Sequence, residues 1–67
     1  MNDRERISKR IAELRRLKGI SQAKLSGLTG IAPGNIARIE IGKYSTEIDI
    51  LSKIADAMGY KLDFIEK

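Results

Sequence analysis

The side chains of this 67-residue chain offer charge and hydrogen bonding but little covalent chemistry. Histidine and cysteine do not occur, which removes the usual zinc ligands, disulfides and His- or Cys-based catalysis. The nine Asp and Glu residues include no pair that spacing would force together. Thirteen Lys and Arg residues leave a net charge of +4, which is compatible with a polyanionic partner. The composition therefore disfavours an enzyme and predicts neither a metal nor another cofactor.

Residues 21–42 read as two short helices joined by a tight turn. Ser21 is a good N-cap for the first of them, and Gly30 ends it. Pro33 suits the first position of the second helix, which Gly42 stops after about two and a half turns. This stretch is predicted to be a helix-turn-helix.

The second of these helices has two faces. Ile36 and Ile39 share a face that is predicted to be buried, with Glu40 beside them. The roughly opposite face carries Gly34, Arg38 and Ile41. Because the residues near its N-terminus are small, that end of the helix can approach another surface closely.

The flanking segments are expected to hold this stretch in place. Residues 4–18 form a helix with Asp3 as N-cap, Gly19 as stop and an apolar stripe of Ile7, Ile11 and Leu14. A later helix starts at Ser45 or Thr46 as its cap and runs to about Met58, with apolar positions at Ile48, Leu51, Ile54, Ala55 and Met58. The helix after Ser21 supplies Ala23, Leu25 and Leu28.

The tail, residues 60–67, is ambiguous. Tyr60, Leu62 and Phe64 alternate with Lys61 and Asp63, which is the period of a strand. A lone strand would need a partner, and a second copy paired antiparallel would supply it. A fifth helical turn, or a tail folded onto the helices or frayed, remains the alternative.

A chain of this length is predicted to form one small domain, residues 1–67. No apolar run reaches transmembrane length, and the charged N-terminus is not followed by a signal core, so we expect a cytoplasmic protein with no membrane partner. The predicted fold class is all-α, a compact four-helix domain with a short C-terminal strand.

Several motifs at fixed spacing carry a family resemblance. They are Gln22 with Leu25, Gly30 with Ile31, and the run N-I-A-R-I-E-I-G-K at residues 35–43. With these in register, the chain resembles the lambda-repressor-like, or Cro/Xre-type, helix-turn-helix family over nearly its whole length. The resemblance implies a compact bundle of four or five helices that binds operator DNA, usually as a homodimer.

The resemblance also implies roles for single residues. Asn35 and Arg38 match groove-facing positions and could bond adenine and guanine edges, although either could bind phosphate, and Asn35 could cap its helix locally. Gln22 matches a glutamine that bonds a phosphate and braces the start of the second helix. Arg15 and Glu40 match a structural ion pair. Lys43 matches a further phosphate-contact position. Ser21 could contact a phosphate in addition to capping its helix, and Tyr44 could either anchor its loop or bond a phosphate.

Pro33 and Gly34 depart from the family pattern, in which these base-reading positions usually carry polar side chains. Pro33 could still touch a thymine methyl group, and Gly34 could bring the backbone close to a phosphate. Specificity then rests on Asn35, Arg38 and DNA shape.

The short chain and its ending are also similar to the antitoxin repressors of toxin–antitoxin modules, some of which pair through a C-terminal strand. That similarity makes Tyr60, Leu62 and Phe64 candidate dimer contacts and a toxin protein a candidate partner. The function expected from the resemblance is a dimeric repressor on a palindromic operator, and the alternative is a protein-interaction module.

Overall fold

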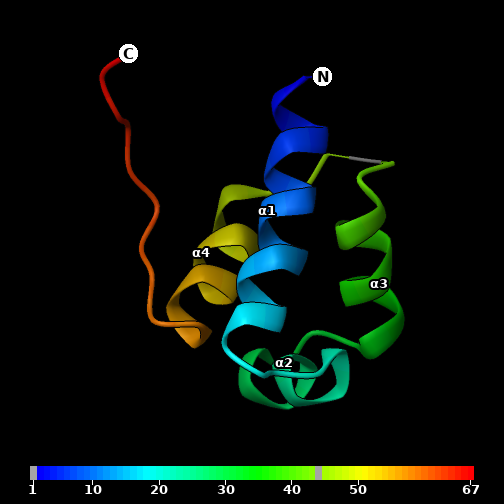
Figure 1. The fold of residues 1–67 in the computed structure, drawn as a ribbon. Helices are drawn as coiled ribbons and strands as arrows, with labels where there is room; N and C mark the ends of the chain where they lie inside the picture. Colours follow the sequence, from blue (N-terminus) through cyan, green and yellow to red (C-terminus); the bar gives the residue numbers. More distant parts are fainter. Residues whose placement is uncertain (1, 44) are drawn as a thin grey trace.

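The computed structural model describes residues 2–43 and 45–67 and confirms the all-α prediction. Its four helices pack into a compact bundle (Figure 1). They are α1 (Asp3–Leu17), α2 (Gln22–Thr29), α3 (Pro33–Ile41) and α4 (Ile48–Ala57). None of these four helices is long and apolar enough to cross a membrane.

The helix ends follow local capping chemistry at most positions. The Ser21 hydroxyl accepts a hydrogen bond from the Lys24 N–H, as predicted, and Gly30 and Gly42 close α2 and α3 with positive φ angles of 77° and 80°. At the start of α1 the cap is Asn2, whose side chain accepts from the Glu5 N–H, so the prediction of Asp3 was wrong by one residue.

The prediction for the start of α4 was wrong as well. Neither Ser45 nor Thr46 caps this helix; Glu47 stands at the N-cap position, and its side chain makes no capping hydrogen bond. The backbone enters α4 only after Glu47, which leaves both hydroxyl residues in the preceding loop.

One apolar core joins the four helices. Its fully or nearly fully buried members come from every helix and from the residue that closes α4: Ile11, Leu25, Ile36, Ile39, Ile54 and Met58. Helix α3 packs against α1 and α2, and α2 also packs against α4. Contacts with the core therefore hold one face of α3, and its opposite face is exposed to solvent.

Three predicted apolar positions lie outside this core. Leu28 is 51% exposed, Ile48 is 74% exposed, and Ala23 is also exposed. Leu28 stands in the last turn of α2, and Ile48 is the first residue of α4. Helical spacing places both on an apolar stripe, but their burial depends on which distant residues pack against them.

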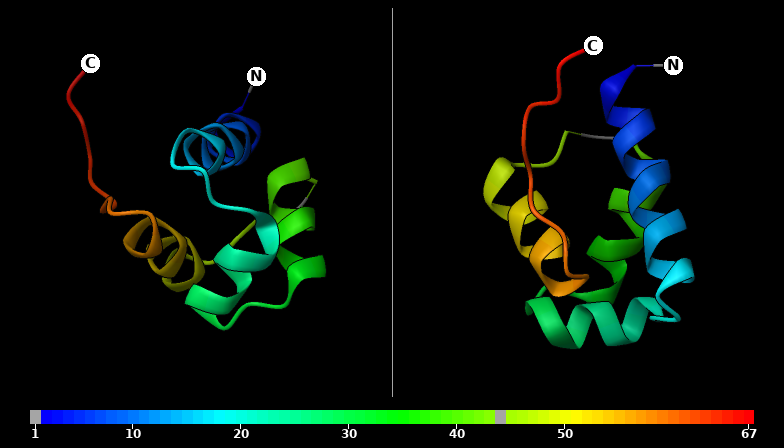
Figure 2. Two further views of the ribbon diagram at one scale, coloured as in Figure 1. Left: turned by 60° about the horizontal axis from the view of Figure 1, so that its bottom comes forward. Right: turned by 60° about the vertical axis from the view of Figure 1, so that its left-hand side comes forward.

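The tail does not form a strand or a fifth helix in the single chain. Residues 60–67 start at the end of α4 and run as an irregular extended segment toward the end of the bundle that holds the N-terminus (Figure 2). That strand is predicted only in a pair of copies, because a strand needs hydrogen bonds to a neighbour, so it stays a prediction. The alternative of a fifth helical turn does not occur in the described residues 60–67.

Gly42 is predicted to be the most constrained glycine in the chain. Its φ angle is +80°, and a Cβ atom there would lie 3.2 Å from both Cβ and Oγ of Ser8 on α1. We expect Gly42→Ala to lower the free energy of unfolding by about 2–4 kcal/mol, through the backbone conformation and the steric contact together. Denaturant titration followed by circular dichroism measures the loss.

Gly30→Ala is the matched control for Gly42. Its φ angle is +77°, but nothing lies within 4 Å of an added Cβ atom. This variant should lose only the backbone term of about 1–2 kcal/mol. Equal losses in the two variants would show that the contact with Ser8 does not matter.

Candidate nucleic-acid interface

The turn that leads into α3 is held by side chains of α2. The Thr29 hydroxyl donates to the carbonyl of Leu25 at 2.8 Å and accepts from the N–H of Ile31 at 3.2 Å. The Ser26 hydroxyl donates to the Ile31 carbonyl. These bonds fix the path of the chain immediately before Pro33, so the direction in which α3 starts is set by α2.

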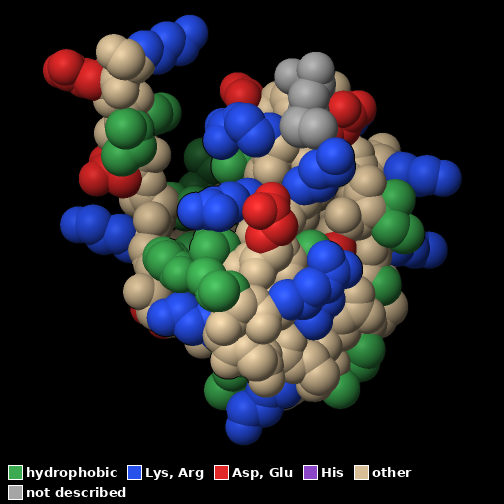
Figure 3. All heavy atoms as spheres, viewed as in Figure 1, with side chains coloured by type: hydrophobic (Ala, Val, Ile, Leu, Met, Phe, Trp, Pro, Cys, Tyr) green, Lys and Arg blue, Asp and Glu red, His purple; other side chains and the backbone are tan. Residues whose placement is uncertain are grey.

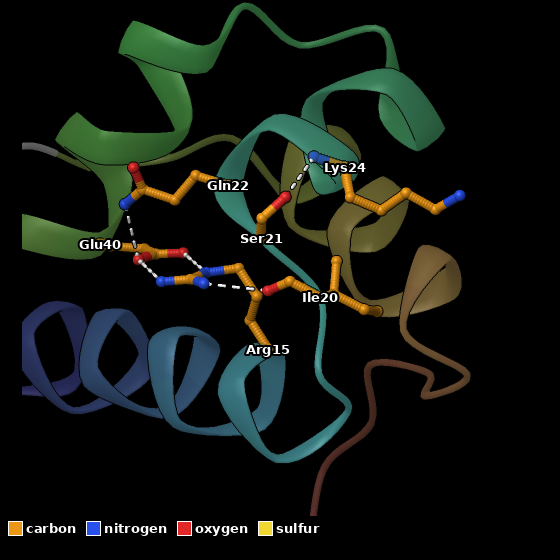
Figure 4. Close-up of polar contacts among 6 residues, drawn as sticks. All are labelled: Arg15, Ile20, Ser21, Gln22, Lys24 and Glu40. Carbon is orange, nitrogen blue, oxygen red and sulfur yellow. Dashed lines mark hydrogen bonds and ion pairs between the residues drawn. The ribbon is translucent and has the colours of Figure 1, made fainter.

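The far end of α3 is tied to α1 by an ion pair. The Arg15 guanidinium donates to both carboxylate oxygens of Glu40, with Nε–Oε2 and Nη2–Oε1 distances of 2.7 and 3.0 Å (Figure 4). A third bond runs from Nη1 of Arg15 to the carbonyl of Ile20 at 2.9 Å. The side chains of Arg15 and Glu40 are only 10% and 6% exposed, so water competes little for these bonds.

The pair shifts the acid–base behaviour of both groups. Burial pushes the pKa of Glu40 upward, but the hydrogen bonds from Arg15 and Gln22 together with the positive charges of Arg15 and Arg16 outweigh burial and hold the pKa below its ordinary value of 4.5. The hydrogen bond to Glu40 raises the pKa of Arg15. Both groups are therefore charged at neutral pH, and the link between α1 and α3 is ionic.

Gln22 lies elsewhere than the resemblance implied. Its Nε2 donates to Oε1 of Glu40 at 3.0 Å, so it braces the end of α3 and not the start (Figure 4). The first residue of α3 is Pro33, which offers no side-chain hydrogen bond. Gln22 is half-buried, which leaves part of its side chain open to a ligand.

The outer edge of α3 is open. Pro33, Gly34, Asn35 and Arg38 are all exposed, whereas Ile36 and Ile39 are 1% and 3% exposed. Among the described residues, no group bonds the Asn35 side chain, so the local capping alternative does not occur in this structure. This edge thus exposes the guanidinium of Arg38 and the amide of Asn35, and the opposite face of the same helix is packed into the core.

A hollow of about 450 Å³ lies beside this edge. Asn35, Arg38 and Ile39 line it from α3, and the loop before α4 and the first turn of α4 line it from the other side with Ser45, Thr46, Glu47 and Ile50. The sequence pattern did not connect Thr46 or Glu47 with the α3 edge, because no local signal places a loop against a helix ten residues earlier. The hollow mixes one cation, one carboxylate, hydroxyls and apolar surface.

The remaining predicted contacts are distributed around the ends of α2 and α3. Lys43 is exposed and follows the C-cap of α3 directly. Ser21 is exposed, and its hydroxyl already accepts from the backbone at the start of α2. Tyr44 lies outside the described residues.

Charge on α1 is partly neutralised within the helix. Arg6 pairs with Asp3 at 3.2 Å, and Arg10 pairs with Glu13 at 4.0 Å. Figure 3 shows Lys and Arg side chains spread over this face with Asp and Glu between them. The charges of Arg6 and Arg10 are therefore partly balanced by acidic residues of the same helix.

The comparison with known proteins agrees with this architecture. The profile of a helix-turn-helix family, of the Cro/Xre type, matches residues 11–65, and the chain belongs to this family. The chain is similar to the SPbeta prophage-derived uncharacterized HTH-type transcriptional regulator YonR of Bacillus subtilis (strain 168), with 30% identity over 61 residues that cover 91% of the chain. It spans 56% of the length of that relative. No solved structure matches the chain significantly.

Proposed function

We propose that the protein is a sequence-specific DNA-binding transcriptional regulator, acting as a dimeric repressor on a palindromic operator. The main support is the exposed edge of α3, which carries Asn35 and Arg38 on a helix fixed by the core and by the Arg15–Glu40 pair. Family membership and a relative named as a transcriptional regulator support the same function.

In this proposal α3 enters the major groove. Arg38 donates two hydrogen bonds to guanine O6 and N7, and Asn35 bonds N6 and N7 of adenine. Pro33 and Gly34 bring the start of α3 close to the bases without polar side chains, and Pro33 can touch a thymine methyl group. Part of the specificity then comes from DNA shape and not from hydrogen bonds.

Phosphate contacts in this proposal flank the groove. Ser21 and Gln22 at the start of α2, and Lys43 with Tyr44 after α3, contact the backbone on the two sides of the reading helix. Such contacts fix the orientation of the domain but carry no sequence information themselves. Two copies on a palindrome would place their α3 helices about 34 Å apart, one turn of DNA.

The proposed dimer forms through residues 60–67. Tyr60, Leu62 and Phe64 are 38%, 43% and 101% exposed, so their apolar surface is available to a second chain. Truncation after Gly59 should convert the dimer to a monomer in a mass measurement. A truncated chain that stays dimeric would assign the interface to the helices.

Arg38→Ala is predicted to lower specific DNA affinity by about 1–3 kcal/mol and to relax specificity at one base position. The reason is the loss of a bidentate donor whose side chain is exposed. Selection of a binding site from random DNA, followed by titration of wild type and variant on that site and its point variants, measures both effects. An equal loss of affinity for the specific site and for random DNA would show that Arg38 does not contact a base.

Lys43→Ala should weaken specific and random binding alike and flatten the slope of log K against log salt by about one unit. Lys43 is a cation next to α3 that no described residue pairs with. Titrations at several salt concentrations give the slope. An unchanged slope would exclude a phosphate contact, and Arg38→Ala serves as the comparison that alters specificity.

A second candidate is a protein-interaction module whose partner is a toxin protein. The absence of polar side chains at Pro33 and Gly34 and the exposed apolar tail favour it. A gel shift on selected and random DNA over a salt series distinguishes the two functions. A regulator binds one site with steep salt dependence, and competitor DNA does not displace it from that site. A protein-interaction module shows neither property.

A further inference from the structure

The tail carries an alternation of apolar and charged side chains that the single chain leaves uncovered. Resting on the dimer in the proposed function, we propose that two tails pair as antiparallel strands in one particular register. In that register Leu62 lies opposite Leu62 of the second copy. The partner of this surface is thus a second copy of the chain, and the register follows from charge and from free backbone groups.

Two-fold symmetry restricts the possible registers. When two identical antiparallel strands are related by an axis perpendicular to the sheet, one residue must lie opposite its own copy, and its neighbours pair symmetrically about it. The symmetric registers of residues 60–67 therefore differ in which residue lies on the axis and in whether that residue takes a hydrogen-bonded or a non-hydrogen-bonded position. Each choice determines all the cross-strand pairs.

The charges select among these registers. With Leu62 on the axis, Lys61 lies opposite Asp63 of the second copy, and this pair occurs twice. With Lys61 or Asp63 on the axis, like charges lie directly opposite each other, which destabilises a strand pair.

Registers centred further along the tail fit less well. With Phe64 on the axis, Lys61 opposes Lys67. With Ile65 on the axis, Asp63 opposes Lys67 favourably, but the apolar Phe64 opposes the charged Glu66. Only the register centred on Leu62 joins unlike charges on one face and apolar side chains on the other.

The backbone groups agree with this register. The Tyr60 N–H donates to the carbonyl of Ala55, and the Phe64 N–H donates to Oδ1 of Asp63, both at 2.8 Å. The N–H groups of Lys61 and Asp63 donate to no other described residue. Lys61 and Asp63 can therefore form the hydrogen-bonded pairs of the ladder.

Tyr60, Leu62 and Phe64 then occupy the non-hydrogen-bonded positions, where opposite side chains come closest. Tyr60 lies opposite Phe64 of the second copy, and this pair also occurs twice. Aromatic side chains stabilise such cross-strand pairs. The Tyr60 ring is already placed against the end of α1, with Lys18 Nζ 5.1 Å from its centroid. Pairing would cover Phe64, which is 101% exposed in the single chain.

Single cysteine variants test the register directly, since the chain contains no cysteine of its own. Leu62→Cys should form a disulfide-linked dimer on mild oxidation, because a residue on the axis is within about 4.5–5.5 Å of its copy. Lys61→Cys and Asp63→Cys should crosslink poorly alone but efficiently when the two variants are mixed. Efficient disulfide formation between two copies of the Asp63→Cys variant overturns the register. Equally efficient disulfide formation by each of the three variants alone overturns it too.

Charge reversal gives an independent measurement. Lys61→Asp or Asp63→Lys alone should raise the dimer dissociation constant about tenfold, since each places two pairs of like charges in contact. The double variant Lys61→Asp/Asp63→Lys should restore the wild-type value. Additive losses in the double variant overturn the proposed pairing.

The DNA affinity of the full chain separates this inference from the proposed function. Specific DNA binding without the Leu62→Cys crosslink overturns only the register. An efficient crosslink in a protein that does not bind DNA specifically overturns the proposed regulator and leaves the paired tails in place. A wild-type chain that runs as a monomer at concentrations well above those of DNA binding overturns the paired tails.

Discussion

Replacing Glu40 by alanine is expected to lower the free energy of unfolding by about 3–5 kcal/mol. The change leaves Arg15, whose side chain is 10% exposed, with one remaining bond to the Ile20 carbonyl, and it also removes the acceptor of Gln22. A domain of this size has roughly 3–10 kcal/mol of stability in total. The variant should therefore be close to unfolding at room temperature, as denaturant titration at neutral pH would show.

The control removes both charges. Arg15→Met combined with Glu40→Leu should recover most of the lost stability, because apolar side chains of similar volume can replace a buried ion pair at little cost. A double variant as unstable as Glu40→Ala would mean that the site needs the hydrogen bonds themselves. A loss below about 1 kcal/mol in Glu40→Ala would show that Arg15 reaches solvent easily.

The same pair predicts a pH dependence. The pKa of Glu40 is lower in the folded chain than its ordinary value of 4.5, so its contribution to stability is complete above that value. The contribution is lost as the pH falls through the folded pKa. The stability difference between wild type and Glu40→Gln should thus stay constant well above pH 4.5 and shrink as the pH falls below 4.5. A difference that stays constant would show that Glu40 ionisation is not coupled to folding.

Leu25→Ala is expected to cost about 2–5 kcal/mol, the second large effect in the chain. Leu25 is 0% exposed and lies in the cluster that joins α2 to the core. The substitution leaves a cavity beneath the helix-turn-helix, and the surrounding side chains can close it only in part. Thermal and denaturant unfolding measure the loss.

Leu28→Ala is the matched control, one turn later on the same helix. Leu28 is 51% exposed, so the same chemical change should alter the free energy of unfolding by only about 0.5 kcal/mol. Equal losses at the two positions would contradict the placement of the core. DNA binding by Leu28→Ala should remain unchanged, since this side chain lies in none of the proposed contacts.

Much of the fold could be predicted from the sequence because the signals are local. Ser21, Gly30, Pro33 and Gly42 act on the backbone within one helical turn, and the structure starts and ends α2 and α3 where these residues predict. The spacing of Ile36 and Ile39 is equally local, and both side chains are buried. Arg15 and Glu40 were connected only through the family resemblance, since they lie 25 residues apart.

The sequence by itself determined that this chain is a small all-α domain with a helix-turn-helix at residues 21–42, because capping and helical periodicity involve only near neighbours. The tertiary structure decided the rest: that Gln22 bonds Glu40 at the end of α3, that Leu28 and Ile48 stay exposed, and that the loop before α4 forms a hollow beside Arg38. Each of these depends on how residues far apart in the sequence pack against one another, which no local pattern contains. The conformation of residues 60–67 belongs to the same group, since a strand there requires a second chain.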